Sequence, residues 1–148
     1  MIARRLGTGV ALARLSALLT LFSVLKHLVP LPTLARWSWR PSNEHERHEP
    51  PSRRTGYVLR AAQLVRTTER NCLQRSLVLY RELSRLGCDP ALVIGFGFER
   101  QRLAGHAWVT VNDRIVGDDP TDVARFAPVC TFGRSGVMRP FPVASSSA

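Results

Sequence analysis

The sequence predicts an α+β fold in which N-terminal helices are followed by a small antiparallel sheet packed on a helix. The spacing of apolar residues carries this prediction, because it changes along the chain. Before Pro90 apolar residues recur every three or four positions, as on one face of a helix; after Pro90 they recur every second position, as in a strand. The dipeptide Asn112-Asp113, between two strand patterns, is a hairpin signal and indicates antiparallel pairing.

Length and composition fit one globular domain with a modest core. The chain has 148 residues, of which 45% are apolar and 22% are charged, and this balance is ordinary for a folded protein. Its net charge of +10 is compatible with nucleic acid, an anionic membrane surface or an acidic peptide as partner. A surface that simply uses Arg at its polar positions gives the same charge, so charge alone does not choose among these classes.

Residues 1–40 form an apolar helical segment in this interpretation. The apolar stretch 15–25 has helical spacing and is bracketed by Arg14 and Lys26, which makes it shorter than the roughly 20 residues that span a bilayer. A signal peptide fits poorly, since no small-residue cleavage site follows. We therefore expect one amphipathic helix that docks on the domain or on a partner, with contact to a membrane surface as an alternative.

Residues 41–54 are polar, charged and flanked by proline, which is typical of a linker or exposed loop. His45 and His48 lie three positions apart there. This spacing invites a metal-binding interpretation, but a solvated loop explains it as well, and we expect no metal site. Residues 55–143 then form the main domain, and residues 144–148 a disordered tail.

Two helices are expected in the main domain, over residues 57–65 and 72–86. The second has an apolar stripe predicted to be buried, made of Leu73, Leu77, Tyr80 and Leu83. Its charged positions are predicted to face solvent: Arg75, Arg81, Glu82 and Arg85. Asn71 is a favourable N-cap, Gln74 would complete a capping box, and Gly87 suits the left-handed residue after the last turn.

Three strands and one polar connection are expected after the helices: strands 91–98, 106–111 and 114–117, and connection 99–104. In the first strand the even-numbered residues share one face. Gly95 and Gly97 leave space on the opposite face, where another part of the chain is expected to come close to the backbone.

The chain has three cysteines, Cys72, Cys88 and Cys130, an odd number without regular spacing. This pattern is not a disulfide framework, and the cysteines and histidines do not show the spacing of a zinc site. We therefore expect a reducing compartment, the cytoplasm. In that setting, a lone cysteine with a distant histidine and aspartate is a candidate nucleophile set.

Cys72 is the candidate nucleophile because it would occupy the first turn of a helix. The free backbone N–H groups and partial positive charge there favour an anion, and the thiolate is the reactive form of cysteine. The same N–H groups could stabilise a developing oxyanion. The alternative is that Cys72 is a small buried apolar residue, which is a frequent role of free cysteine.

His106 opens a strand and shares a face with Trp108, which could wall a site; each could equally be an ordinary structural residue. A base histidine works best when a third group holds its other ring nitrogen. A two-residue turn at Asn112-Asp113 would place Asp119 opposite His106, whereas a three-residue bulged turn would place Asp118 on the face of His106. Periodicity leaves both registers open.

Together these residues resemble a known family. The segments Asn71-Cys72-Leu73-Gln74-Arg75-Ser76-Leu77, Leu92-Val93-Ile94-Gly95 and Gly105-His106-Ala107-Trp108-Val109, with an aspartate after the hairpin, resemble the transglutaminase-like leader peptidases of lasso-peptide biosynthesis, the microcin-processing family. The resemblance covers residues 55–125. It implies a transglutaminase-like, papain-like core in which the sheet packs on the helix that carries the nucleophile.

The resemblance also implies roles. The nucleophile would be Cys72, the base His106, and the acid Asp118, since the family's aspartate lies twelve residues after the histidine; a bulged turn is then implied. The sequence departs from the family pattern at Gly117 and by the second aspartate, Asp119. The implied activity is a cysteine protease that cleaves the leader from a ribosomally made precursor, without metal or redox cofactor.

The resemblance further implies partners for this antibiotic-type biosynthesis. The precursor would be the substrate, and a separate leader-recognition protein is expected because residues 1–54 leave no room for that domain; a lasso cyclase is a further candidate partner. Two other functions remain open. One is another amide hydrolase or transferase on the same fold, and the other is a basic non-enzymatic module, although the sequence lacks the interleaved basic and aromatic residues of nucleic-acid binders.

Overall fold

A computed structural model describes residues 2–41, 56 and 71–141. The first two helices are α1 (Ile2–Leu28) and α2 (Leu31–Ser38), and the central helix is α4 (Cys72–Arg85). The remaining elements are β1 (Pro90–Glu99), β2 (Arg102–Val111), β3 (Arg114–Val116), α5 (Pro120–Val123), β4 (Ala127–Phe132), the 3-10 turn η3 (Arg134–Gly136) and β5 (Met138–Pro140). The helix expected over 57–65, most of the 41–54 loop and the tail lie outside the described residues.

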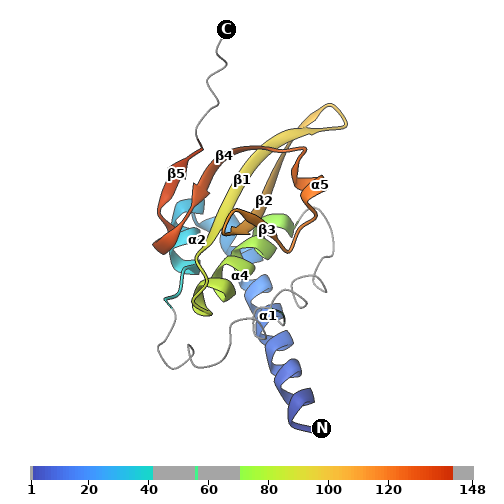
Figure 1. Cartoon of the computed structure of the whole chain (residues 1–148), viewed down its shortest axis with the longest axis vertical. Coiled ribbons are helices and arrows are strands. Elements are labelled where there is room, and N and C mark those ends of the chain that lie inside the picture. Colours follow the sequence, from blue (N-terminus) through green and yellow to red (C-terminus); the bar gives the residue numbers. More distant parts are fainter. Residues whose placement is uncertain (1, 42–55, 57–70, 142–148) are drawn as a thin grey trace.

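The strands form one antiparallel sheet in the order β3-β2-β1-β4-β5. With the helices grouped before it, this sheet confirms the predicted α+β class (Figure 1). The expected connection 99–104 is wrong in extent, because β1 and β2 run on until only Arg100 and Gln101 remain as a turn. Both have positive φ, 46° and 65°, a conformation that sequence signals normally assign to Gly or Asn. Strands β4 and β5 had no counterpart in the sequence prediction.

Helix α4 is covered on two sides, since it contacts β1 and β2 as well as α1 and α2 (Figure 1). Its predicted stripe is confirmed: Leu77, Tyr80 and Leu83 are fully buried, and Leu73 packs against the same core. The core continues into the N-terminal helices through Leu15, Phe22, Leu34 and Ala35, and into the sheet through Leu92, Val109 and Phe132.

The prediction that the charged positions of α4 face solvent is wrong for Arg75 and Glu82, which are both buried. Glu82 pairs with Arg14 of α1 at 2.9 Å, and Arg75 pairs with Asp118. A helix with a single apolar stripe is expected to be wet on its other side. Here Glu82 is paired with Arg14 of α1, and Arg75 is paired with Asp118 after β3, so both charges lie at interfaces.

The sequence predicted the C-terminal end of α4 correctly but not the capping at its N-terminal end. Asn71 is the N-cap residue, but its side chain makes no capping hydrogen bond to the helix, so the capping box with Gln74 does not form. The C-terminal prediction is confirmed, because Gly87 has φ +82° and Cys88 N–H donates to the Leu83 carbonyl at 3.0 Å. Glycine tolerates this left-handed position, where other residues are strained.

The N-terminal part forms two helices instead of the single one expected. The break falls just before Pro30. Pro30 is the N-cap residue of α2 and has an extended backbone, and the helix begins at Leu31 and Pro32. Proline suits the first helical turn because its missing N–H is not needed there. Within the described residues, no helix combines the length and apolar character that a membrane crossing requires.

Candidate functional site

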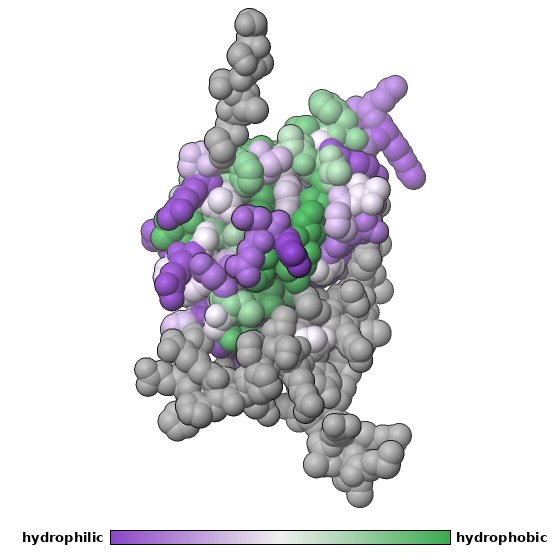
Figure 2. Space-filling model, viewed as in Figure 1, coloured by the Kyte–Doolittle hydropathy of each residue, from purple (hydrophilic) through white to green (hydrophobic). Residues whose placement is uncertain are grey.

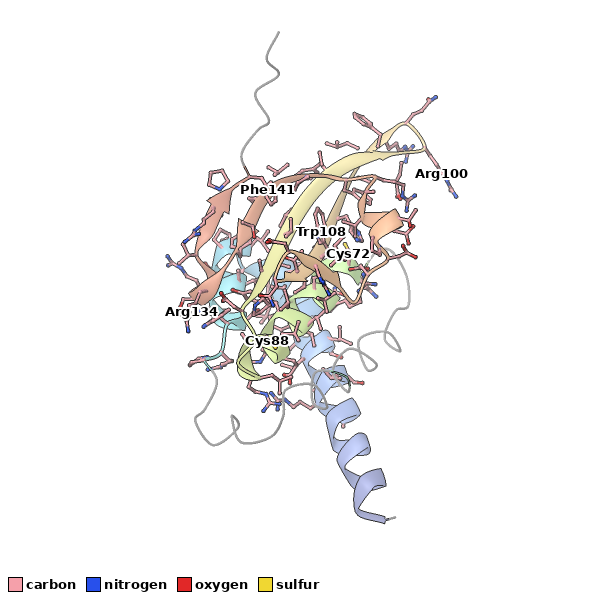
Figure 3. The ribbon with its side chains drawn as sticks, viewed as in Figure 1. Cys72, Cys88, Arg100, Trp108, Arg134 and Phe141 are labelled. Atoms are coloured by element: carbon pink, nitrogen blue, oxygen red, sulfur yellow. The ribbon has the colours of Figure 1, made fainter. Side chains whose placement is uncertain are left out.

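Cys72 is the first residue of α4, and its partly buried side chain packs against the main core. One helical turn later, Ser76 Oγ donates a 2.8 Å hydrogen bond to the carbonyl of Ala107 in β2. Residues four apart lie on the same helix face, so Cys72 lies on the face of α4 that approaches β2. Figure 3 shows Cys72 at the end of α4 nearer to α5.

His106 lies on the opposite face of β2 from the main core. Ala107 and Val109 point into the core shared with α4, whereas Trp108 belongs to a second cluster with Val123 and Phe126. His106 and Trp108 are two positions apart in β2, so their side chains point to the same face of the sheet. Its ring stacks on Phe126 at a centroid distance of 4.8 Å and on Trp108 at 6.1 Å, which confirms the expected shared face.

The β2–β3 register corrects one expectation. Val109 pairs with Val116 and Val111 with Arg114, so Asn112 and Asp113 form a two-residue turn, with φ 49° and 60°. The bulged turn implied by the family spacing is therefore wrong. A primed turn of this kind matches the twist of paired strands and explains why it forms at an Asn-Asp sequence.

Asp118 nevertheless has an electrostatic effect on His106. Regular strand alternation in this register would direct Asp118 away from the face of His106. The alternation stops before it, because β3 ends at Val116 and Gly117 has φ +80°. Among the charges that affect His106, Asp118 raises its pKa most, against the lowering effect of burial.

Asp118 also connects the sheet to α4. Its side chain, only 7% exposed, forms an ion pair and hydrogen bond with Arg75, whose side chain is 10% exposed. Arg75 lies three residues after Cys72, within the first turns of the helix. Asp118 is therefore tied to the start of the Cys72 helix and also raises the pKa of His106.

Asp119 has a different position. It is the N-cap residue of α5, and its exposed side chain accepts a 2.9 Å hydrogen bond from the Thr121 N–H. This is the ordinary task of an aspartate at a helix start. The alternative in which Asp119 faces His106 as the third group finds no support in this geometry.

The pKa of His106 is lowered, first by burial and then by the Arg75 guanidinium, while Asp118, Asp122 and Glu99 act in the raising direction. Its Nε2 atom is buried without a hydrogen-bond partner among the described residues. A neutral imidazole with a free nitrogen can accept a proton. The arrangement therefore offers a proton acceptor whose pKa a buried carboxylate raises.

Of the three predicted side chains, the structure relates one pair, His106 and Asp118, and does not bring in Cys72. Asp118 acts on His106 and is tied to α4, whereas a hydrogen bond between Cys72 and His106 is absent in the described part of the chain. At His106 the sheet has no further strand among the described residues, since β3 pairs with β2 only at residues 109–111. The start of α4 reaches this open edge through Ser76 and Ala107.

Two neighbours of the site were missed by sequence reasoning. Arg75 was placed in solvent, although its position three residues after Cys72 put it close to any site there. Phe126 lies in an irregular segment, and nothing in the local pattern marks it as a partner of His106. In the described ranges, metal-ligating side chains do not gather in groups of three or more.

A family model described as the transglutaminase-like superfamily matches residues 11–131. Neither the search of curated proteins nor the search of solved structures gave a match. The matched span includes most of α1, all of α4 and the sheet as far as Thr131 of β4. The fold agrees with this match, and the chain therefore belongs to the transglutaminase-like superfamily, which includes cysteine peptidases.

Proposed function

We propose that the protein is a cysteine peptidase that removes the leader from a lasso-peptide precursor, with Cys72 as nucleophile, His106 as base and Asp118 as the group that orients the base. The observation that carries the proposal is that Asp118 pairs with Arg75 at the start of the Cys72 helix and is the charge that most raises the pKa of His106. Membership of a superfamily that includes cysteine peptidases supports the same chemistry.

In the proposed reaction, His106 takes the proton of the Cys72 thiol, and the thiolate attacks the scissile carbonyl carbon. The imidazolium then gives its proton to the leaving amine, and a thioester remains on Cys72. Water hydrolyses the thioester while His106 accepts its proton and returns it to the thiolate. Asp118 stabilises the imidazolium in both halves.

This sequence of steps requires the thiol to come within hydrogen-bond reach of His106. Catalytic hydrogen bonds are often long in the free enzyme and shorten only when substrate is bound. The buried, unpartnered Nε2 atom is the acceptor that such an approach would use. The neutral imidazole favoured by burial is the protonation state that the first step needs.

The other two cysteines are weaker candidates. Cys130 lies on β4, and burial raises the pKa of its thiol, which disfavours the reactive thiolate. Cys88 follows the C-terminal end of α4, where the helix dipole favours cations over anions. Only Cys72 combines a helix start with closeness to the strand of His106.

The proposal carries the expected partners with it. The substrate is the leader part of a precursor, a separate protein recognises the leader, and a lasso cyclase acts on the product; nucleic acid has no role. The site of action is the cytoplasm, where the apolar N-terminal helix can contact a membrane surface. The residues described here do not by themselves require a metal or a redox cofactor for these steps.

The test is mass spectrometry of a candidate precursor incubated with the protein and its recognition protein. Cys72→Ala should abolish cleavage with an unchanged circular dichroism spectrum, while Cys88→Ala and Cys130→Ala should retain it. Cleavage by the Cys72→Ala protein at the wild-type rate would exclude Cys72 as nucleophile.

A second candidate function is amide transfer, which the transglutaminase-like family match favours. It uses the same thioester, with an amine in place of water as acceptor. Adding a primary amine to the same incubation separates the two. A peptide–amine conjugate replacing the hydrolysed product would assign transfer.

A further inference from the structure

The outer edge of β2 near the Arg100-Gln101 turn has backbone groups that no described strand uses. In an antiparallel pair joined by a two-residue turn, facing residues alternate between hydrogen-bonded and non-hydrogen-bonded pairs. Since Glu99 faces Arg102 next to the turn, the N–H and C=O groups of Leu103, Gly105 and Ala107 point away from β1.

The Ala107 carbonyl is occupied, because it accepts the hydrogen bond from Ser76. Leu103 and Gly105, whose backbone groups also point away from β1, are both exposed. Strand β3 does not reach them, because it pairs with β2 only at residues 109–111. Within the described part of the chain, this short edge is therefore open to another strand. It ends beside His106 and the start of α4.

One face of the same hairpin is apolar and exposed. Phe96, Phe98 and Leu103 are 44%, 77% and 68% exposed, and Phe98 faces Leu103 across the pair. The ring of Phe96 lies over Gly105, where a Cβ would meet it at 3.3 Å. The core that α4 covers reaches only to Ile94 on this strand, so the face beyond it lacks a helix in the described residues.

The tip of this hairpin is basic. Arg100 and Arg102 are exposed, and the nearby carboxylate of Glu99 is shared with Arg125 at 3.7 Å. Figure 2 shows apolar side chains next to a hydrophilic tip at the upper right, where Figure 3 places Arg100. Together with the net charge of +10, this tip favours a partner that carries carboxylates.

We propose that residues 103–105 of β2 bind an extended, acidic segment of the substrate peptide as an added strand. Backbone hydrogen bonds to Leu103 and Gly105 would hold it, alternate apolar side chains would pack on Phe96, Phe98 and Leu103, and a carboxylate would lie near the arginine tip. This inference rests on the proposed function, because the edge leads to His106 and so would align the segment that adjoins the scissile bond.

The test uses the full-length Cys72→Ala protein, so that binding is measured without cleavage. A display library of random twelve-residue peptides is selected on it, and the enriched peptides should combine alternating apolar residues with Asp or Glu at one end. Affinity is then measured by fluorescence anisotropy with a synthetic copy of one enriched peptide.

Two substitutions probe the site. Leu103→Pro removes one outward N–H but no bond to β1, and Phe98→Ser removes apolar surface; each should weaken binding by about tenfold. Met138→Ala, which removes an exposed apolar side chain from β5 at the far edge of the sheet, is the matched control and should bind like the parent.

N-methylated copies of the peptide test strand addition without changing the protein. Methyl groups on alternate amides should abolish binding in one of the two alternation patterns and not in the other. Equal binding to Leu103→Pro, Phe98→Ser and parent protein, no enriched peptides, or concentration-dependent dimers that bury this edge would overturn the inference. Because the Cys72→Ala protein is used, loss of the peptidase proposal would leave this binding result standing, and the reverse also holds.

Discussion

Asp118 and its ion-pair partner Arg75 have opposite effects on the pKa of His106. Asp118 acts in the direction that raises the pKa of the ring, whereas Arg75 acts in the lowering direction. Both members of the ion pair are at least nine-tenths buried at the side chain. A carboxylate held this firmly has few orientations open to it, which is the property that a group orienting a base requires.

Arg75→Gln should therefore destabilise the protein by about 3–5 kcal/mol, because it leaves the buried Asp118 charge without its partner. Arg75→Lys should recover part of the loss. The measurement is urea unfolding, with Arg125→Gln as control. Arg125 pairs with Asp122 at an exposed site, where such a change costs about 0–1 kcal/mol. A stability of Arg75→Gln equal to that of Arg125→Gln would contradict the buried-pair interpretation.

His106 should make stability depend on pH. Its folded pKa is lowered by burial, so between that value and the unfolded value of about 6.5 the unfolded chain binds more protons. The stabilising effect is present above the unfolded pKa and is lost as pH falls through it toward the folded pKa. Unfolding free energies at about pH 7.5 and about pH 5 should differ more for wild type than for His106→Gln.

The exposed His27 of α1 provides the matched control for that experiment. His27→Gln removes an imidazole from the surface and should keep the wild-type difference between the two pH values. An identical pH response in wild type and His106→Gln would show that His106 is not the titrating group responsible.

At the scale of elements, Gly117 decides where Asp118 points. It ends β3 with φ +80°, and a Cβ there would meet the Leu79 side chain of α4 at 2.8 Å. The glycine thus allows the strand to stop next to the helix. The side chain of Asp118, which follows, is released from strand alternation and pairs with Arg75 of α4.

Gly117→Ala should cost about 1–2 kcal/mol of stability from the left-handed backbone alone, and it should reduce peptidase activity by displacing Asp118. Gly133→Ala is the control, because its φ is negative and nothing lies within 4 Å of an added Cβ. Thermal unfolding and precursor cleavage measure the two effects. Full activity in Gly117→Ala would show that the position of Asp118 does not depend on this residue.

At the scale of the whole molecule, one core joins the N-terminal helices to the helix of Cys72. Phe22 of α1 is 3% exposed and lies in the same cluster as Leu77 and Val109. Arg14 adds a link from α1 to Glu82 of α4. The family match, which begins at residue 11, includes most of this helix. The placement of α4, and with it of Cys72, therefore depends on α1.

Phe22→Ala should destabilise the protein by about 3–5 kcal/mol, since it removes a large side chain from a packed core. The adjacent Leu21 is 51% exposed, and Leu21→Ala should change stability by less than about 0.5 kcal/mol. Urea unfolding of both variants checks this. Similar stabilities for the two would mean that α1 contributes little to the core.

Sequence reasoning reached the features that depend on neighbouring residues. The α4 stripe, the Gly87 stop and the Asn112-Asp113 turn follow from local periodicity and backbone preference, and the structure contains all three. The close approaches expected at Gly95 and Gly97 are also present: an added Cβ would meet the Ala127 carbonyl at 2.7 Å and the Arg125 carbonyl at 2.4 Å.

The sequence by itself determined the α+β class, the helix that begins at Cys72 and the strand that carries His106. Each of these follows from the spacing of apolar residues, which differs between helices and strands. Only the tertiary structure decided that Arg75 is buried and paired with Asp118, that Asp119 caps α5, and that the edge of β2 near His106 lacks a neighbouring strand in the described residues. Those features arise where segments far apart in the chain pack together, and packing depends on shape and charge across the whole fold, which no local pattern records.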